Sequence, residues 1–334
     1  MFDYYKVVVI TPYYNRADYV VKSVDSLINQ DYDDYHVIVI NDGSTDSTSQ
    51  VLNRYSSCDR VTIVNQENKG LTKSLSDIIS GLNCKYVAIH GSGDVSHPDR
   101  LRTQVELLEG GGDYCLCGTS SQNLDPDTND VIDYQKFPKT ILHKNDFLSA
   151  PPFTHGTAMF DKRKYDMVGG YDRRFKYSQD WDLWLRLMDV GDAYMLKEIQ
   201  YTRYALRDGA SFQPSKASKQ LYFKYLALMF DSGSVGREEY FDNSKKSDEV
   251  NSEISSKVKG DLERRVLKLI LIDREKEASE LRVFCESEYG GLSLYITILY
   301  SCLIYLSRIG INPKKFSTLF RRLLDISRRM RRGI

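Results

Sequence analysis

Short apolar runs alternate with amphipathic segments along the first 90 residues, and this rhythm constrains the fold more than any other feature. The runs, which are rich in branched residues and typical of buried strands, are residues 6–10, 36–40, 61–64 and 86–89. Between the first two runs, Val20, Val24 and Leu27 recur at helical spacing. The alternation predicts a doubly wound, mostly parallel α/β sheet with helices on both faces.

The four loops that follow these strands are expected to form one ligand site. They read T-P-Y-Y-N-R, N-D-G-S-T-D, N-Q-E-N-K-G and H-G-S-G-D-V. Each is polar and contains glycine or proline, and such loops gather at the carboxyl edge of a parallel sheet, where ligands usually bind. No G-x-G-x-x-G follows the first strand, which excludes a Rossmann dehydrogenase.

The rest of the chain predicts more strands and then a helical region. We expect strands at residues 115–122 and 154–160, and an amphipathic helix at 179–190. Beyond Ser211 the pattern becomes helical, with a polar, serine-rich break from Asp242 to Ser256. We therefore divide the chain into a domain at 1–215 and a helical C-terminal region at 216–334.

Six motifs, in order over residues 6–187, resemble those of a family 2 glycosyltransferase with the GT-A fold. Besides the first two loops they are N-K-G-L, Y-V-A-I-H-G-S-G-D-V-S-H-P-D-R-L, V-G-G-Y-D and Q-D-W-D-L-W-L-R-L. The resemblance implies an inverting, hexosyltransferase-like enzyme that moves a sugar from a nucleotide-sugar to an acceptor hydroxyl. Its expected role is the assembly of a cell-surface polysaccharide or a lipid-linked glycan. The alternative is a catalytically silent protein that binds sugar nucleotides or serves as a scaffold.

Asp180 matches the residue that acts as the base in this family. An inverting transfer needs one group to take the acceptor's proton as its oxygen attacks the anomeric carbon. Asp182 lies two residues further on, so the two side chains cannot point the same way from a helix. The structural alternative is that both acids merely favour a helix N-terminus by their charge.

The resemblance also implies which residues contact the two substrates. Those expected on the donor side are Thr11, Pro12, Tyr13, Asn15, Asp42, Gly43, Asn68, Gly70, Lys73, Gly91, Ser92, Gly93, Asp94 and Arg207. Among them, Asp42 matches the family position that holds the nucleotide base, although a strand-end turn would also explain it. Those expected on the acceptor side are His155, Gln179 and Trp181. A lone histidine is more often structural than functional, but the expected position of His155 at the cleft makes the two roles equally plausible.

The acidic cluster of the family falls here on Gly91, Ser92, Gly93 and Asp94, which leaves one carboxylate and puts the metal in doubt. Asp94 could still hold Mg²⁺ or Mn²⁺ with help from the diphosphate and water. Alternatively, backbone N–H groups of the glycine loop could form an anion-binding nest, with charge added by Lys73 or Arg100. A third account is a protein that has lost catalysis. Arg207 stands where relatives often carry a metal-binding histidine, and it could supply charge to the leaving diphosphate.

The net charge of the chain is zero, but residues 308–334 carry nine basic residues and one acid, Asp325. Apolar residues between the arginines have near-helical spacing, which is typical of a helix on an anionic membrane surface. A helix packed on its own domain is the alternative, and nucleic-acid binding is not expected. The uncharged run at 292–307 is too short to span a membrane. Six scattered cysteines indicate a cytoplasmic protein, and the basic tail suggests peripheral attachment to the membrane's cytoplasmic face.

Overall fold

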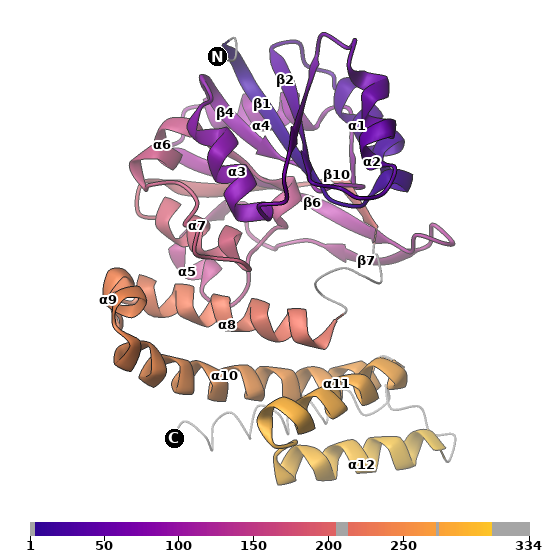
Figure 1. The fold of residues 1–334 in the computed structure, drawn as a ribbon, viewed down its shortest axis with the longest axis vertical. Coiled ribbons are helices and arrows are strands. Elements are labelled where there is room, and N and C mark those ends of the chain that lie inside the picture. Colours follow the sequence, from indigo (N-terminus) through magenta and orange to yellow (C-terminus); the bar gives the residue numbers. More distant parts are fainter. Residues whose placement is uncertain (1–3, 205–212, 272–273, 309–334) are drawn as a thin grey trace. The chain divides into compact units, whose positions relative to one another are not determined.

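The computed structural model describes residues 4–204, 213–271 and 274–308 (Figure 1). The chain divides into two compact units, residues 1–207 and 208–334. The boundary predicted at residue 215 falls in the first turn of α8, which begins at Pro214. All six cysteines lie in the described part and are free.

The first unit is built on one sheet with strand order β3-β2-β1-β4-β9-β6-β10-β5, in which β7 also pairs with β6, and β8 with β10. The strands are β1 (Tyr5–Tyr13), β2 (Tyr35–Asp42), β3 (Val61–Gln66), β4 (Cys84–Ile89), β5 (Val95–Ser96), β6 (Tyr114–Leu124), β7 (Val131–Gln135), β8 (Ile141–Leu142), β9 (Met159–Asp161) and β10 (Asp192–Tyr204). Pairs β1–β2, β1–β4, β2–β3 and β6–β10 are parallel. The predicted mostly parallel sheet is confirmed.

The helices around this sheet follow the predicted alternation. They are α1 (Val20–Ile28), α2 (Thr48–Leu52), α3 (Leu71–Ser80), α4 (Arg100–Glu109), α5 (Lys144–Phe147), α6 (Lys162–Met167) and α7 (Gln179–Leu187). Val20, Val24 and Leu27 of α1 are fully buried in the core, as their spacing predicted. The strands beneath are equally apolar, since Val7, Val9 and β2's Val37 are also fully buried.

The prediction of a strand over residues 154–160 is wrong in its first half. Residues His155–Thr157 form a turn of 3₁₀-helix, and β9 begins only at Met159. β9 is a short antiparallel strand between β4 and β6. The hydroxyl of Thr157 donates to the carbonyl of Thr154 at 2.8 Å, which closes the turn locally instead of leaving this segment extended.

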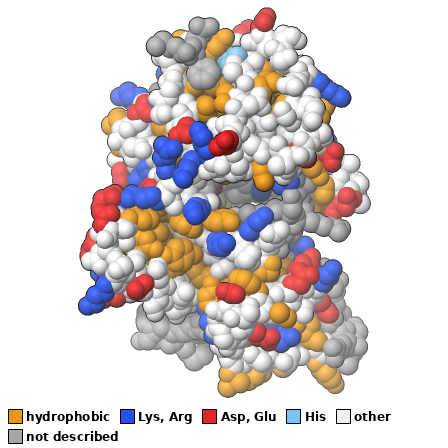
Figure 2. Space-filling model, viewed as in Figure 1, with side chains coloured by type: hydrophobic (Ala, Val, Ile, Leu, Met, Phe, Trp, Pro, Cys, Tyr) orange, Lys and Arg blue, Asp and Glu red, His pale blue; other side chains and the backbone are white. Residues whose placement is uncertain are grey.

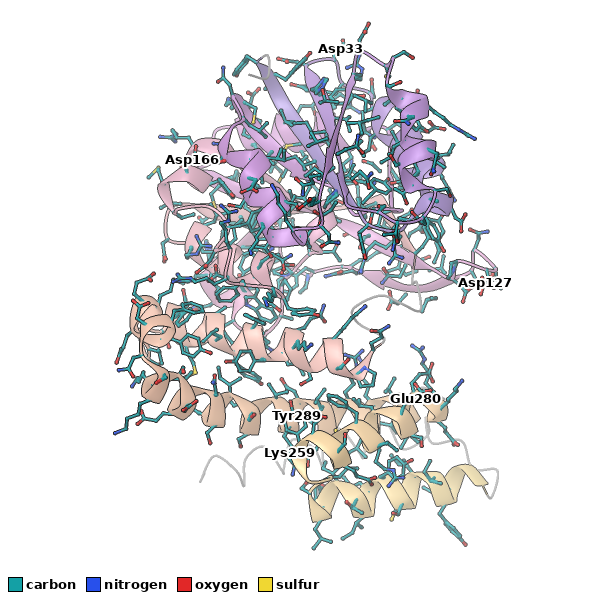
Figure 3. All side chains as sticks on the ribbon, viewed as in Figure 1. Asp33, Asp127, Asp166, Lys259, Glu280 and Tyr289 are labelled. Atoms are coloured by element: carbon teal, nitrogen blue, oxygen red, sulfur yellow. The ribbon has the colours of Figure 1, made fainter. Side chains whose placement is uncertain are left out.

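The second unit is helical, as predicted. Its helices are α8 (Pro214–Asp231), α9 (Arg237–Asp242), α10 (Ser244–Leu271), α11 (Glu275–Tyr289) and α12 (Leu294–Arg308). The predicted break from Asp242 to Ser256 is wrong, because α10 is continuous from Ser244. Val250, Ile254 and Val258 recur every four residues and are buried, so the polar composition hides one apolar face. Lys259 of α10 donates to the carbonyl of Tyr289 at the end of α11, at 2.9 Å (Figure 3).

Helix α12 covers most of the uncharged run that the sequence singles out. Ile296, Leu299 and Leu303 are buried, while Leu294 and Tyr305 are exposed, and hydrophobic side chains are visible where α12 lies (Figure 2). Among the described residues, no helix is both long and apolar enough to cross a bilayer. The basic segment predicted to dock on membranes, residues 309–334, lies outside the described residues.

Candidate active site

The carboxyl ends of β1, β2 and β4 meet at one edge of the sheet (Figure 1). Asn15 joins the loops that follow β1 and β2 by hydrogen bonds. Asn15 has a left-handed backbone, with φ of 51°. Its side-chain oxygen accepts from the Thr45 N–H at 2.8 Å, and its own N–H donates to Ser44 Oγ at 3.1 Å. Asn is one of the few residue types that tolerates this conformation. Asn15 therefore positions the loop that follows β2.

Asp42 is buried at the end of β2 and organises the third loop. Its Oδ1 accepts from Gln66 Nε2 at 2.6 Å, from the Lys69 N–H at 2.9 Å and from Ser74 Oγ at 3.0 Å. Its Oδ2 accepts from the Gly70 N–H at 2.9 Å. Burial raises the pKa of Asp42, but these hydrogen bonds outweigh it and the net shift is downward. A carboxylate oxygen offers two lone pairs, so Oδ2 retains one for a ligand.

The third loop passes directly over the second. Gly43 has φ of +71°, and a Cβ there would lie 2.5 Å from the Asn68 nitrogen, so only glycine fits. Gly70, with φ of +81°, faces open space and leads into α3. Lys73 is exposed on α3, and its neighbour Lys69 pairs with Asp77 at 3.3 Å. The structure thus brings Asp42, Gly43, Asn68 and Gly70 together.

The residues predicted at the end of β1 lie under the site. Thr11 and Tyr13 are fully buried, and Pro12 is half-buried. The Tyr13 ring packs in the core and presents no face to a ligand in this structure, because α1 covers it, with Val20 and Val24 in the same apolar cluster. The exposed aromatic ring of this loop belongs to Tyr14, which is 49% exposed.

Residues 91–94 form a tight turn after β4. The Asp94 N–H donates to the Gly91 carbonyl at 3.1 Å, and Gly93 has φ of +94°, as the third position of a type II turn requires. The predicted anion nest does not form, because two of its three N–H groups already have protein acceptors. Gly91 donates to the Tyr201 hydroxyl at 2.8 Å, and Gly93 donates to Ser23 Oγ at 3.3 Å. Ser92 supplies the remaining N–H of the three.

Asp94 is held by β10, which the sequence did not place at the site. The Tyr201 hydroxyl donates to Asp94 Oδ2 at 2.9 Å. Burial raises the pKa of Asp94 to about 6, against the opposing effects of the Arg203 charge and of this hydrogen bond. The one sequence feature that could have indicated this role is the alternation Y-T-R-Y, which puts Tyr201 and Arg203 on one face of β10. The alternation alone does not show that this face lies beside Asp94, because that depends on the pairing of β10 with β5, which joins residues over 100 positions apart.

Arg100, considered above as a source of charge for the diphosphate, is fully buried instead. Its guanidinium donates to the Ile89 carbonyl at 3.0 Å and to Gln104 Oε1 at 3.1 Å, and it lies 5.1 Å from the centre of the Tyr201 ring. Arg100 therefore braces β4 and the tyrosine from inside, and the suggestion that it contacts a ligand is wrong for this structure.

Asp180 lies in the first turn of α7, and its charge acts on a histidine–tyrosine pair. His155 Nε2 is 2.6 Å from the Tyr171 hydroxyl. Burial lowers the pKa of His155, against the opposing charge of Asp180. Burial also raises the pKa of Tyr171 well above its usual range, and the negative charge of Asp180 adds to this effect. Both groups are therefore neutral, and the hydrogen bond joins an un-ionised imidazole to an un-ionised hydroxyl. Next to His155, Gly156 packs against the Tyr201 hydroxyl, which connects this group to the turn at 91–94.

The two acids of α7 have different surroundings. Asp182 is 1% exposed and accepts from Arg186 Nη2 at 2.6 Å, while Asp180 is partly exposed and accepts from the N–H of Trp181 at 2.9 Å. The neighbouring side chains predicted on the acceptor side, Gln179 and Trp181, are largely buried, with 7% and 8% exposed. Asp182 therefore fixes the helix, and Asp180 is the acid that keeps access to solvent.

The residues present do not match a preformed cation site. Among residues 4–204, 213–271 and 274–308, no three His, Cys, Asp or Glu side chains come together as metal ligands. Asp94 brings one carboxylate, and Tyr201 already occupies one of its oxygens. Arg207 lies outside the described residues.

Comparison with known proteins identifies relatives for this arrangement. The model of the family described as "Glycosyl transferase family 2" matches residues 8–169. EpsE of Bacillus subtilis (strain 168), which is named as a glycosyltransferase, is 33% identical over 202 residues, covering 59% of this chain and 72% of EpsE. Chondroitin synthase of Pasteurella multocida (strain Pm70) is 27% identical over 286 residues, or 84% of this chain. The chain spans 29% of the length of that synthase.

Solved structures share the fold. TarS 1–349 of S. aureus, in complex with UDP-GlcNAc, has a TM-score of 0.55 and 16% identity, and the match covers 91% of this chain and 92% of that one. The mannosyltransferase PcManGT of Pyrobaculum calidifontis, in complex with GDP-Man and Mn²⁺, has a TM-score of 0.57 and 15% identity, covering 97% and 86%. The predicted GT-A fold is confirmed.

Proposed function

The chain belongs to glycosyl transferase family 2, and on that basis we propose that it transfers a sugar from a nucleotide-sugar to a hydroxyl of a growing glycan. The relationship to EpsE supports glycosyl transfer, and the relationship to chondroitin synthase supports polysaccharide assembly as the setting. The UDP-GlcNAc and GDP-Man bound by its structural neighbours support a nucleotide-sugar donor. We propose further that the transferred sugar is a hexose and that the transfer inverts the anomeric carbon.

The donor would bind over the loops that follow β1, β2 and β3. The free lone pair of Asp42 Oδ2 suits an N–H of the nucleotide base, because a buried carboxylate fixed by four donors is a rigid acceptor. The exposed ring of Tyr14 and the open surface at Gly70 lie on the two loops beside it. The sugar would then extend toward the turn at 91–94 and α7.

Asp180 would act as the general base. As the acceptor oxygen forms its bond to the anomeric carbon, the acceptor's proton passes to the Asp180 carboxylate. The bond between the anomeric carbon and the phosphate oxygen breaks, and the nucleoside diphosphate leaves with that electron pair. Because the acceptor attacks from the side opposite the leaving group, the configuration inverts.

The observation that carries this proposal is the unequal environment of Asp180 and Asp182. Asp182 is committed to a buried ion pair with Arg186, whereas no ion pair within the described residues holds Asp180. Asp180 is partly exposed, and its charge acts on His155 and Tyr171, whose neighbour Gly156 contacts the turn at 91–94 through Tyr201. This placement of the Asp180 carboxylate, in one group of contacts with the turn at 91–94, supports its assignment as the base.

The test is Asp180→Asn, compared with Asp189→Asn, an exposed acid just beyond α7 that pairs with Lys144. We expect Asp180→Asn to keep nucleotide affinity and to lose transfer by a factor of about 100 or more, which is the usual contribution of a positioned base. Asp189→Asn should leave both unchanged. Turnover retained in Asp180→Asn would contradict the assignment. Donor binding without transfer or donor hydrolysis in the wild type would favour the scaffold alternative.

A further inference from the structure

We propose that Arg203 takes the place of the divalent cation and holds the donor's diphosphate directly, with Tyr201 keeping Asp94 unavailable to metal. This inference rests on the proposed function, since it concerns the same donor site. It names two residues of β10 that the sequence motifs did not include, and it predicts a donor site that works in the presence of a chelator.

The turn at 91–94 has no room for a second acidic side chain of the kind found in the family's acidic cluster. A Cβ on Gly93 would lie 2.9 Å from Tyr19 Cβ, and φ of +94° disfavours any side chain. A Cβ on Gly91 would lie 2.4 Å from Asp94 Oδ2. The packing of this turn therefore requires glycine at positions 91 and 93, so Asp94 is the one carboxylate that residues 91–94 can offer.

Tyr201 occupies one oxygen of the Asp94 carboxylate. Its hydroxyl donates to Asp94 Oδ2 and accepts from the Gly91 N–H, and its ring is fully buried, 5.2 Å from the His90 ring. The packing leaves the ring in one position. A cation at Asp94 Oδ2 would have to compete with a charge-assisted hydrogen bond from a tyrosine whose ring is fully buried.

Arg203 stands opposite Asp94. The antiparallel pairs of β10 and β5 are Tyr201 with Ser96 and Thr202 with Val95, so the same register places Arg203 across from Asp94. Residues two apart on a strand share a face, which puts the Arg203 side chain on the side of the Tyr201 hydroxyl. Its positive charge acts on Asp94. The side chain is half-buried, and within the described residues it makes no hydrogen bond or ion pair.

The other nearby cations are less suited to the task. Arg100 is buried and donates to backbone and Gln104, and Lys69 pairs with Asp77. A guanidinium offers a planar fork of donors that matches two phosphate oxygens and carries its charge at every working pH. Arg203 can therefore supply the charge stabilisation that the leaving diphosphate needs, in a place where the protein offers too few ligands for a metal.

The experiment is calorimetry of UDP, GDP and dTDP, and of the matching nucleosides, in EDTA and in Mn²⁺. For the diphosphate that binds, we expect wild-type affinities in EDTA and Mn²⁺ to agree within about twofold. Arg203→Gln should weaken the diphosphate about tenfold or more, as expected for a charged hydrogen bond, and leave the nucleoside unchanged. The control Arg102→Gln, which breaks an exposed pair with Asp31, should change neither.

Two further variants guard against misfolding. Arg203→Lys keeps the charge and should retain part of the affinity. Tyr201→Phe keeps the ring and frees Asp94, so Mn²⁺ should strengthen diphosphate binding in this variant while leaving the wild type unaffected. The inference about Arg203 would be overturned if EDTA abolished diphosphate binding to the wild type, or if folded Arg203→Gln bound the diphosphate as tightly as the wild type does. Either result would leave the proposed function standing. Failure of every diphosphate to bind the wild type would refute the donor class itself.

Discussion

Gly156→Ala is the substitution that most directly tests how the site is held together. Gly156 lies in the 3₁₀ turn between the donor loop and the acceptor side, where the backbone conformation allows alanine. An alanine Cβ would nevertheless lie 2.4 Å from the Tyr201 hydroxyl oxygen and 3.2 Å from the Gly91 nitrogen. The tyrosine ring is fully buried and cannot rotate away, so its hydroxyl must leave Asp94 and Gly91.

The expected loss follows from the two hydrogen bonds. The bond to the Asp94 carboxylate contributes about 1.5–3 kcal/mol and the bond from the Gly91 N–H about 1 kcal/mol, so the free energy of unfolding should fall by about 2.5–4 kcal/mol. For a unit of 207 residues, this corresponds to a Tm lower by about 5–15 °C. Nucleotide affinity should fall as well, because the turn at 91–94 loses its anchor.

Tryptophan fluorescence is the appropriate assay. The chain has two tryptophans, Trp181 and Trp184, and both lie in the first unit, so their emission reports on that unit alone. The matched control is Gly81→Ala, at the end of α3, where φ is −94° and the nearest atom to a new Cβ is the Ile78 carbonyl oxygen at 3.8 Å. Gly81→Ala should be neutral or stabilising by up to about 1 kcal/mol. A Gly156→Ala protein as stable as this control would refute the reasoning.

Three further predictions concern other parts of the chain. Asp42→Asn should destabilise the first unit above pH 4 but not in acid. Hydrogen bonds, acting against burial, lower the pKa of Asp42 below its ordinary 3.8, so the stability advantage of the wild type disappears as pH falls through that lowered pKa. Denaturation at several pH values tests this, and an equal loss of stability at every pH would contradict it. Asp182→Asn should cost about 2–3 kcal/mol by fluorescence, because it breaks a buried ion pair, and a cost no larger than that of Asp180→Asn would contradict this. Removing residues 313–334 should abolish binding to anionic liposomes and spare transfer to a soluble acceptor, and unchanged liposome binding would refute the membrane role.

The local pattern of the sequence was enough to predict the first four strands, their parallel pairing and the loops around Asp42. Each of those signals lies within a few residues, since a buried parallel strand is a continuous apolar run. The same reasoning failed at residues 154–160, where Thr157 closes a turn, and in α10, where a polar composition concealed buried Val250, Ile254 and Val258.

The missed part of the site is the contribution of β10. Tyr201 binds Asp94, and the charge of Arg203 acts on it, because β5, a strand of two residues, pairs antiparallel with β10. No periodicity within either segment specifies that register. The need for glycine at positions 91 and 93 likewise depends on distant contacts, with Tyr201 and Tyr19, so the sequence showed a lost acidic cluster without showing what replaces it.

The stereochemistry of the product tests the central claim most directly. The protein would be incubated with UDP-, GDP- and dTDP-hexoses and oligosaccharide acceptors, and the new linkage would be assigned by NMR. The account predicts transfer from one donor with inversion at the anomeric carbon, and none with Asp180→Asn. Transfer with retention, or equal turnover in Asp180→Asn, would contradict it.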